Sequence, residues 1–298
     1  MTTEKNHLRL PLLMLTLAVT ISLSCAPIQP TNPSGPRGSA NYPVILAEDN
    51  ARRETAQASF TRLSQSVVNG RNAVAAASSS APVDLSPITA TIASLPAANG
   101  SVYLPKVGAS EAMNEEETRE SLRRFLRDWR DVIGSEPARL SLVDHVVQPD
   151  GTTVVNYEQR PFRFPIRGNY GKLQIRFAAD RRILSISSTC IPEADRLRSA
   201  LRGLGATGSL SARLTAEEAT RRLRDSVATA SDSTPATTVP RLPASAQLTP
   251  RELVTHVQPS KTRADALEFR VAWEIDISGA QPKLGYVDAI TGEVFAVE

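Results

Sequence analysis

The stretch Leu267-Glu268-Phe269-Arg270-Val271-Ala272-Trp273-Glu274-Ile275-Asp276-Ile277 decides the fold that the sequence predicts. Its odd positions are all apolar, and its even positions, apart from Ala272, are charged. Alternation with a period of two is typical of a β-strand with one buried face and one face in water. We therefore expect the even face (Glu268, Arg270, Glu274 and Asp276) to be a charged solvent-facing surface. Simple solvation explains such a surface, and a contact with a partner is the alternative.

A tight turn between two further strands follows this stretch, over Tyr286 to Phe295. The Asp288 side chain is placed to accept hydrogen bonds from backbone amides just downstream, and Gly292 can adopt a positive φ where the turn ends. The C-terminal residues therefore predict an antiparallel sheet.

The length of the chain, 298 residues, is enough for two modest domains. Hydrophobic residues make up 41%, charged residues 22%, and the net charge is +3. The arginines alternate with acidic residues, so solvated helix faces account for most of them. We expect no nucleic-acid partner.

The N-terminus has the features of an export signal. Positive residues precede an apolar run, Leu10 to Leu23, which is too short to span a bilayer comfortably. The sequence Ile21-Ser22-Leu23-Ser24-Cys25 resembles a bacterial lipobox, although Ser22 stands where Leu is commoner. We expect a signal over 1–25 and lipidation of Cys25; cleavage after Ala26, which would discard Cys25, is the alternative.

A membrane tether and an N-terminal extension are expected over 26–110, because Pro27 to Ser39 is rich in proline, serine and glycine. Within the extension, Glu48 to Val68 has helical composition. Ile88 to Leu95 and Ser101 to Leu104 are short β-prone pieces that suit edge strands added to a neighbouring sheet.

A helix followed by an antiparallel sheet is predicted twice. The first unit begins at a capping box, Asn114 with Glu117, and its helix ends at Gly134. The second begins at Thr215 with Glu218. The predicted strands are 140–147, 154–159, 173–177 and 183–188 in the first unit, and 253–257, 267–277 and the pair around the Asp288 turn in the second.

Two five-residue stretches support an internal repeat. Leu142-Val143-Asp144-His145-Val146 and Leu253-Val254-Thr255-His256-Val257 differ at one position only. We expect an α+β protein with units over 111–192 and 214–298 joined by a linker over 193–213, and 173–177 as a diverged counterpart of the 267–277 strand.

The motifs that suggest chemistry have simpler interpretations. Gly203-Leu204-Gly205-Ala206-Thr207-Gly208 spells a dinucleotide fingerprint, but a charged, helix-prone segment precedes it where a strand is required. His145 and His256 occupy equivalent repeat positions, which favours a structural role over a shared metal site. Cys190 is expected to be an inert buried thiol. We predict no catalytic residues, no cofactor and no metal.

A family resemblance follows from these residues. Residues from about Leu122 to Pro192 resemble the FTP domain, the fungalysin/thermolysin propeptide motif, through Phe125-Leu126, Val155 to Gln159, and Gly171 to Ile175. Residues from about Leu214 to Val297 resemble a PepSY-like propeptide domain, through Trp273 and Val287 to Val294. No His-Glu-x-x-His zinc motif occurs in the sequence.

The resemblance implies a non-enzymatic module, because prosegments of thermolysin-like metalloproteases assist folding of the protease and occlude its active site. We expect an exported, lipid-anchored protein of the bacterial envelope that binds or inhibits a metallopeptidase, or assists its folding, in trans. The alternative is a structural or ligand-binding envelope lipoprotein that reuses the propeptide fold without a link to proteolysis.

Overall fold

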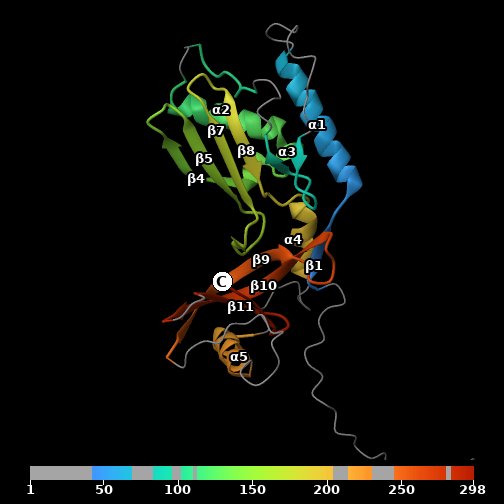
Figure 1. The fold of residues 1–298 in the computed structure, drawn as a ribbon, viewed down its shortest axis with the longest axis vertical. Coiled ribbons are helices and arrows are strands. Elements are labelled where there is room, and N and C mark those ends of the chain that lie inside the picture. The colour runs from blue at the N-terminus through green and yellow to red at the C-terminus, as the bar shows by residue number, and fades with distance from the viewer. Residues whose placement is uncertain are drawn as a thin grey trace, which may run out of the picture. The chain divides into compact units, whose positions relative to one another are not determined.

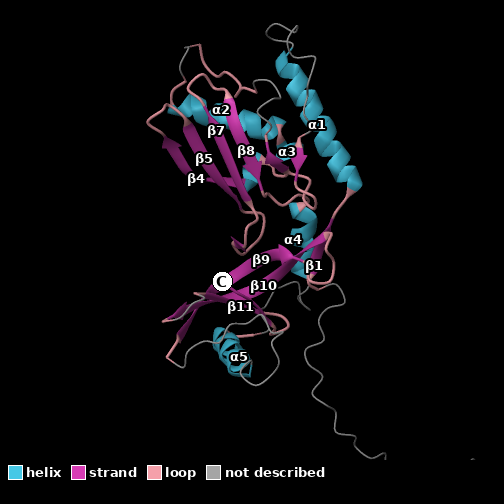
Figure 2. Cartoon of the chain, in the orientation of Figure 1, coloured by secondary structure: helices cyan, strands magenta, loops and turns pink. Residues whose placement is uncertain are grey.

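The protein has an α+β fold with two main antiparallel sheets, as predicted (Figures 1 and 2). The computed structural model describes residues 42–68, 83–95, 102–109, 113–203, 214–229, 245–279 and 283–298. All of them belong to one compact unit, 36–298. The expected signal, Cys25 and the tether lie outside the described residues.

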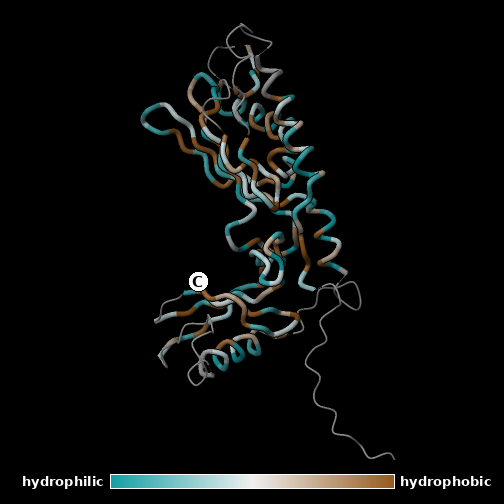
Figure 3. Tube along the Cα trace, turned by 45° about the vertical axis from the view of Figure 1, so that its right-hand side comes forward, coloured by the Kyte–Doolittle hydropathy of each residue, from teal (hydrophilic) through white to brown (hydrophobic). Residues whose placement is uncertain are grey.

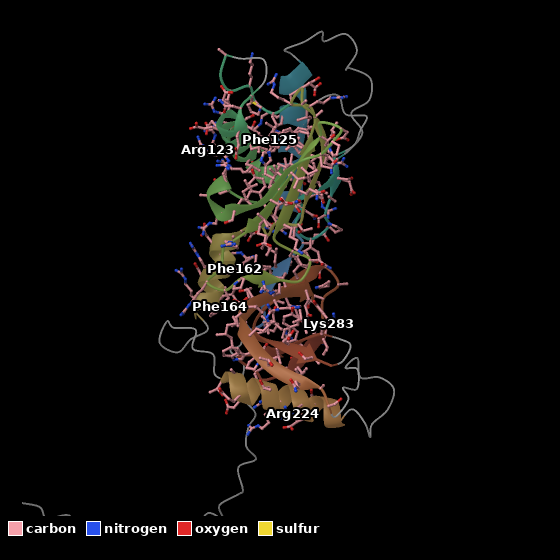
Figure 4. The ribbon with its side chains drawn as sticks, turned by 90° about the vertical axis from the view of Figure 1, so that its left-hand side faces the viewer. Arg123, Phe125, Phe162, Phe164, Arg224 and Lys283 are labelled. Carbon is pink, nitrogen blue, oxygen red and sulfur yellow. The ribbon has the colours of Figure 1, made fainter. Side chains whose placement is uncertain are left out.

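The first sheet is a four-stranded meander in the order β4-β5-β7-β8. Its strands are β4 (Leu140–Val147), β5 (Thr153–Gln159), β7 (Lys172–Phe177) and β8 (Ile183–Ser188). Helix α2 (Glu115–Asp128) precedes them and begins at the predicted capping box, in which Asn114 and Glu117 exchange hydrogen bonds of 2.9 Å. Figure 4 shows Arg123 and Phe125 of this helix, of which Arg123 is exposed and Phe125 is buried.

The predicted single helix up to Gly134 is divided at Trp129. Trp129 has φ −100° and ψ 10°, so α2 ends there and the four-residue helix α3 (Arg130–Ile133) follows. Gly134 ends α3 with φ 83°, as the sequence indicates. A short 3₁₀ turn, η1 (Pro137–Arg139), leads into β4.

The second sheet repeats the arrangement of a helix followed by four strands in chain order. Helix α5 (Ala216–Thr229) begins at the Thr215–Glu218 capping box. The strands are β9 (Gln247–Pro259), β10 (Ala266–Ser278), β11 (Leu284–Asp288) and β12 (Val294–Val297). The sequence indicated only the middle of β9. Strand β10 is the second strand of its meander, so its counterpart in the first sheet is the second strand there, β5. The sequence pointed instead to 173–177, which lies in β7, the third strand.

Short segments from elsewhere in the chain add to these sheets. Strand β1 (Val44–Ala47) pairs antiparallel with β10, and β6 (Ile166–Arg167) pairs parallel with β9. The amide of Ile183, the first residue of β8, donates to the Val102 carbonyl, and the Leu104 amide donates to the Arg181 carbonyl, around a bridge between Tyr103 and Arg182. This last pairing confirms the expected addition of 101–104 to a neighbouring sheet.

The N-terminal extension also contains a helix and a small hairpin. Helix α1 (Asn50–Val68) lies where helical composition predicted it, and β2 (Asp84–Leu85) pairs with β3 (Ile92–Ser94). Phe60 of α1 and Ile92 of β3 are buried in the core of the first sheet. The extension is therefore part of the packed structure.

Helix α4 (Ala194–Gly203) occupies the first half of the stretch expected to be a linker. Leu197 and Leu201 are buried beside Leu46 of β1 and Phe269 of β10. This burial explains why a charged segment forms a helix here: it has one apolar face that packs on the second sheet. Residues 204–213 lie outside the described residues.

One apolar core supports the first sheet and three apolar clusters contain residues of the second. Figure 3 shows hydrophobic and hydrophilic residues alternating along the strands. Phe125, Trp129 and Phe177 are buried in the first core, with the Phe125 and Trp129 rings stacked at 4.9 Å. The odd residues of β10 lie in two of the clusters of the second sheet and are apolar and buried or half-buried, as predicted. Ala219 and Leu223 of α5 cover part of that face.

Gly168 offers a test of how closely the loop after β6 packs on β9. Its φ is 90°, and a Cβ built there would lie 2.5 Å from the Val257 carbonyl oxygen. Gly151 has a similar φ of 79° with nothing within 4 Å. We expect Gly168→Ala to lower the free energy of unfolding by about 1–3 kcal/mol more than Gly151→Ala, because only the first adds overpacking to the cost of a positive φ. Urea unfolding measures both; equal losses would show that the loop moves away at no cost.

Candidate functional site

The expected charged, solvent-facing surface on β10 is instead largely buried, so this prediction was wrong. Glu268, Arg270 and Glu274 are buried, Ala272 is buried between them, and Asp276 is half-buried. Buried charges require partners, because an isolated ion loses its hydration without compensation. The structure supplies these partners from β10 itself, from other strands and from the turn before β12.

Arg270 is the centre of the first cluster of buried charges. Its guanidinium donates to Glu268 at 3.0 Å, to Asp288 at 3.2 Å and to Glu293 at 2.7 Å. The guanidinium also lies over the Phe295 ring, 5.1 Å from its centroid. One cation therefore joins β10 to β11 and to the turn before β12.

Asp288 has two structural functions, which explains the turn that the sequence singled out. Its Oδ1 accepts hydrogen bonds from the amides of Ile290 and Thr291, both at 2.9 Å, and Gly292 has φ 77° as predicted. Its Oδ2 accepts from Arg270 and, at 2.8 Å, from the hydroxyl of Tyr42. The carboxylate thus fixes the turn and ties the start of the described chain to the C-terminal sheet.

Glu274 is the centre of a second cluster. It is 0% exposed and accepts from Arg167 at 2.5 Å, with Arg251 at 3.3 Å and the Tyr286 hydroxyl at 3.4 Å. Arg167 also donates to Glu252 at 2.8 Å. These contacts fasten the loop that carries β6 to the second sheet, so this cluster has a structural function.

His256 is buried in the same face of the sheet, between Tyr286 and Phe295, whose ring centroids lie 4.5 and 5.1 Å away. Neither ring nitrogen has a hydrogen bond; the nearest carboxylate is that of Glu298, 3.5 Å from Nε2. Burial lowers the pKa of His256; Arg270 lowers it further, whereas Glu298 and Glu268 oppose the shift. His256 is a neutral packing residue, as its structural interpretation implied.

This lowered pKa predicts acid sensitivity. The unfolded chain binds a proton at His256 below about pH 6.5 and the folded protein resists it, so stability falls as pH decreases below that value. The loss reaches about 1.4 kcal/mol per pH unit at most and stops below the folded pKa. We expect His256→Phe to remove this component, seen as a shallower decrease in unfolding free energy between pH 7 and 5. Parallel curves for the variant and the wild type would contradict the burial of a neutral imidazole.

A different kind of surface lies on β4. Of the exposed large hydrophobic side chains in the described residues, four belong to this strand: Leu142, Val143, Val146 and Val147, at 40, 55, 45 and 65% exposure. The fifth is Leu184, in β8. Within the described part of the chain, β4 pairs with β5 on one side and has no strand on the other.

The other residues that the sequence singled out for possible chemistry are Cys190, the two histidines and the glycine-rich stretch. Cys190 is buried, and burial raises the pKa of its thiol to about 11, which agrees with the expected buried thiol. His145 lies on β4 and His256 on β9, in different sheets. Helix α4, not a strand, precedes the glycine-rich stretch, whose residues 204–208 lie outside the described residues.

Sequence reasoning missed the β4 surface, because Leu142-Val143 and Val146-Val147 indicate a strand but not its exposure. In the ranges that the structure describes, no group of His, Cys, Asp and Glu side chains is arranged to hold a metal ion. None of the helices in those ranges is long and apolar enough to cross a membrane. No protein-family model matches the chain, and no curated protein sequence matches it.

Proposed function

We propose that the protein is a non-catalytic binding protein that captures an extended segment of a partner protein along β4. The observation that carries this proposal is the concentration of exposed apolar side chains on β4, whose outer edge has no partner strand among the described residues. Edge strands present unpaired backbone N–H and C=O groups, and proteins normally protect them with charges, proline or a covering segment. The eight-residue strand β4 has one exposed charged side chain, Asp144, and carries four exposed apolar side chains.

Strand addition is supported by what the chain does at its other edges. The segment 102–104 adds to the edge of β8, on the opposite side of the same sheet. Strands β1 and β6 extend the second sheet in the same way. A partner strand on β4 would satisfy the backbone groups of that edge, and its alternate side chains would cover the valines.

We take the class of partner from the resemblance to propeptide domains and from the expected export and lipidation of Cys25. These expectations favour a thermolysin-like metallopeptidase or another protein of the cell envelope. The backbone of such a partner would supply the added strand, and the propeptide-like module would inhibit the peptidase or assist its folding in trans.

The test is to titrate purified protein into thermolysin-like metalloproteases and to measure residual activity and complex formation. We expect saturable binding at micromolar concentrations or below, with reduced cleavage of a small peptide substrate if the active site is occluded. No binding to such proteases at micromolar excess, together with no peptidase recovered from the native envelope, would exclude the peptidase as the partner.

A further inference from the structure

A second surface, independent of β4, lies along the loop that connects β5 to β7. A groove of about 450 Å³ is lined by this loop and by neighbouring residues of β5, β7 and β9. The loop carries Phe162 and Phe164, which Figure 4 labels, and the short strand β6. It is therefore an irregular segment with aromatic side chains next to a cavity of ligand size.

The loop is held in place at several points. Phe162 packs edge to face on Phe269, with ring centroids 5.9 Å apart, and β6 pairs with β9. Gly171 at the end of the loop donates its amide to the Thr189 carbonyl at 2.7 Å. A loop fixed in this way loses little conformational freedom when a ligand binds, which favours affinity.

The groove has an excess of positive charge that its own residues do not neutralise. Arg160, Arg163 and Lys172 are exposed, and in the described residues their charged groups form no ion pair. The lining cation that is paired, Arg167, binds Glu252 and Glu274. Against the three unpaired cations stands one unpaired carboxylate of the lining, Glu158.

A larger cleft elsewhere shows the opposite arrangement. It has a volume of about 680 Å³, and its cations are paired with its own acids: Arg52 and Arg196 with Glu193, and Arg139 with Asp195. That cleft has no cationic surplus for a ligand. Its unpaired cations thus distinguish the loop groove from this larger cleft.

Aromatic side chains accompany the cations. Phe162, Phe164 and Tyr170 are half-buried in the lining, and the Arg163 guanidinium lies over the Phe164 ring at 5.4 Å from its centroid. Arginine and aromatic residues are enriched where proteins bind other proteins. A single phosphate ion would use neither the apolar lining nor most of the volume.

We propose that this groove binds an acidic polypeptide segment. Its carboxylates pair with Arg160, Arg163 and Lys172, and an apolar or aromatic side chain of the segment packs against Phe162, Phe164 and Tyr170. Carboxylates suit this lining because a guanidinium can donate two parallel hydrogen bonds to one carboxylate.

The experiment uses the full chain and a fluorescein-labelled hexapeptide of glutamate and tyrosine, with binding followed by fluorescence anisotropy. We expect the triple variant Arg160→Gln/Arg163→Gln/Lys172→Gln to weaken binding at least tenfold. The control Arg62→Gln/Arg221→Gln/Arg224→Gln removes the same charge from exposed helix positions and should keep the affinity. A peptide with glutamine in place of glutamate should not bind.

Three outcomes would overturn the proposal. They are unchanged affinity in the groove variant, equal weakening in the control, and preferential binding of inorganic phosphate or of phosphatidylglycerol vesicles through the same three residues. The variant Val143→Lys/Val146→Lys alters β4 and should leave the affinity for the acidic peptide unchanged. Failure of the strand-capture proposal can therefore be distinguished from failure of the acidic-segment proposal.

Discussion

Replacing Arg270 by alanine is expected to lower the free energy of unfolding by about 3–5 kcal/mol. The change leaves Glu268 and Asp288, both buried, without the cation to which they are hydrogen-bonded at 3.0 and 3.2 Å. Removing one partner from a buried ion pair is costly because the remaining charge stays out of water without its counter-ion. Urea unfolding followed by circular dichroism measures the loss.

Arg263 provides the matched control, because it pairs with Asp265 at 2.9 Å close to the start of β10 and both side chains are about half exposed. Arg263→Ala should leave the urea midpoint almost unchanged. Arg270→Lys should have an intermediate effect, because lysine keeps the charge but not the planar fork that reaches three carboxylates. If Arg270→Ala and Arg263→Ala cost the same, the buried cluster does not stabilise the fold as described.

The double variant Val143→Lys/Val146→Lys is expected to weaken capture of the partner by about a hundredfold or more. Burial of a valine side chain contributes roughly 1.5–3 kcal/mol, and about 2.8 kcal/mol corresponds to a hundredfold change in Kd. Both positions are exposed in the free protein, so lysine should be tolerated there without loss of stability. Isothermal titration with the captured partner measures the change.

Leu184→Lys is the control for this variant, because Leu184 is the exposed large hydrophobic of the described residues that lies outside β4. We expect it to keep the wild-type Kd. Equal weakening by both changes would point to a general effect of added charge, and an unchanged Kd in the β4 variant would place the contact elsewhere.

Local patterns predicted much of the fold. The two capping boxes, the Asp288 turn and the alternation in 267–277 all depend on residues close in sequence, and the structure confirms each of them. The repeat was also visible, since β4 and β9 begin meanders with the same strand order. The alternation in 267–277 did not reveal that the charged side chains of its even face are largely buried.

That environment depends on residues that are distant in sequence. Arg270 is neutralised partly by Asp288 and Glu293. Glu274 is neutralised partly by Arg167, which precedes it by 107 residues in the sequence. Period-two patterning separates polar from apolar positions but cannot distinguish a solvated charge from one that is paired in the fold. The short strands β1 and β6 were missed for a related reason: they are too short to show a period, and only their pairing defines them.

The candidate site was harder to predict than the fold. The sequence pointed to the charged face of β10, where the structure has a buried network, whereas the exposed surface lies on β4. A run such as Leu142-Val143 followed by Val146-Val147 resembles an ordinary buried strand. Its exposure follows from the sheet order, which leaves β4 at the edge.

The most direct test of strand capture is hydrogen–deuterium exchange of the β4 backbone, measured with and without the partner recovered by affinity capture from the native envelope. Strand addition predicts that those amides of Leu140–Val147 that point away from β5 exchange at least tenfold more slowly in the complex, because the partner backbone accepts hydrogen bonds from the open edge. Protection confined to other elements, with β4 exchanging as in the free protein, would contradict the account.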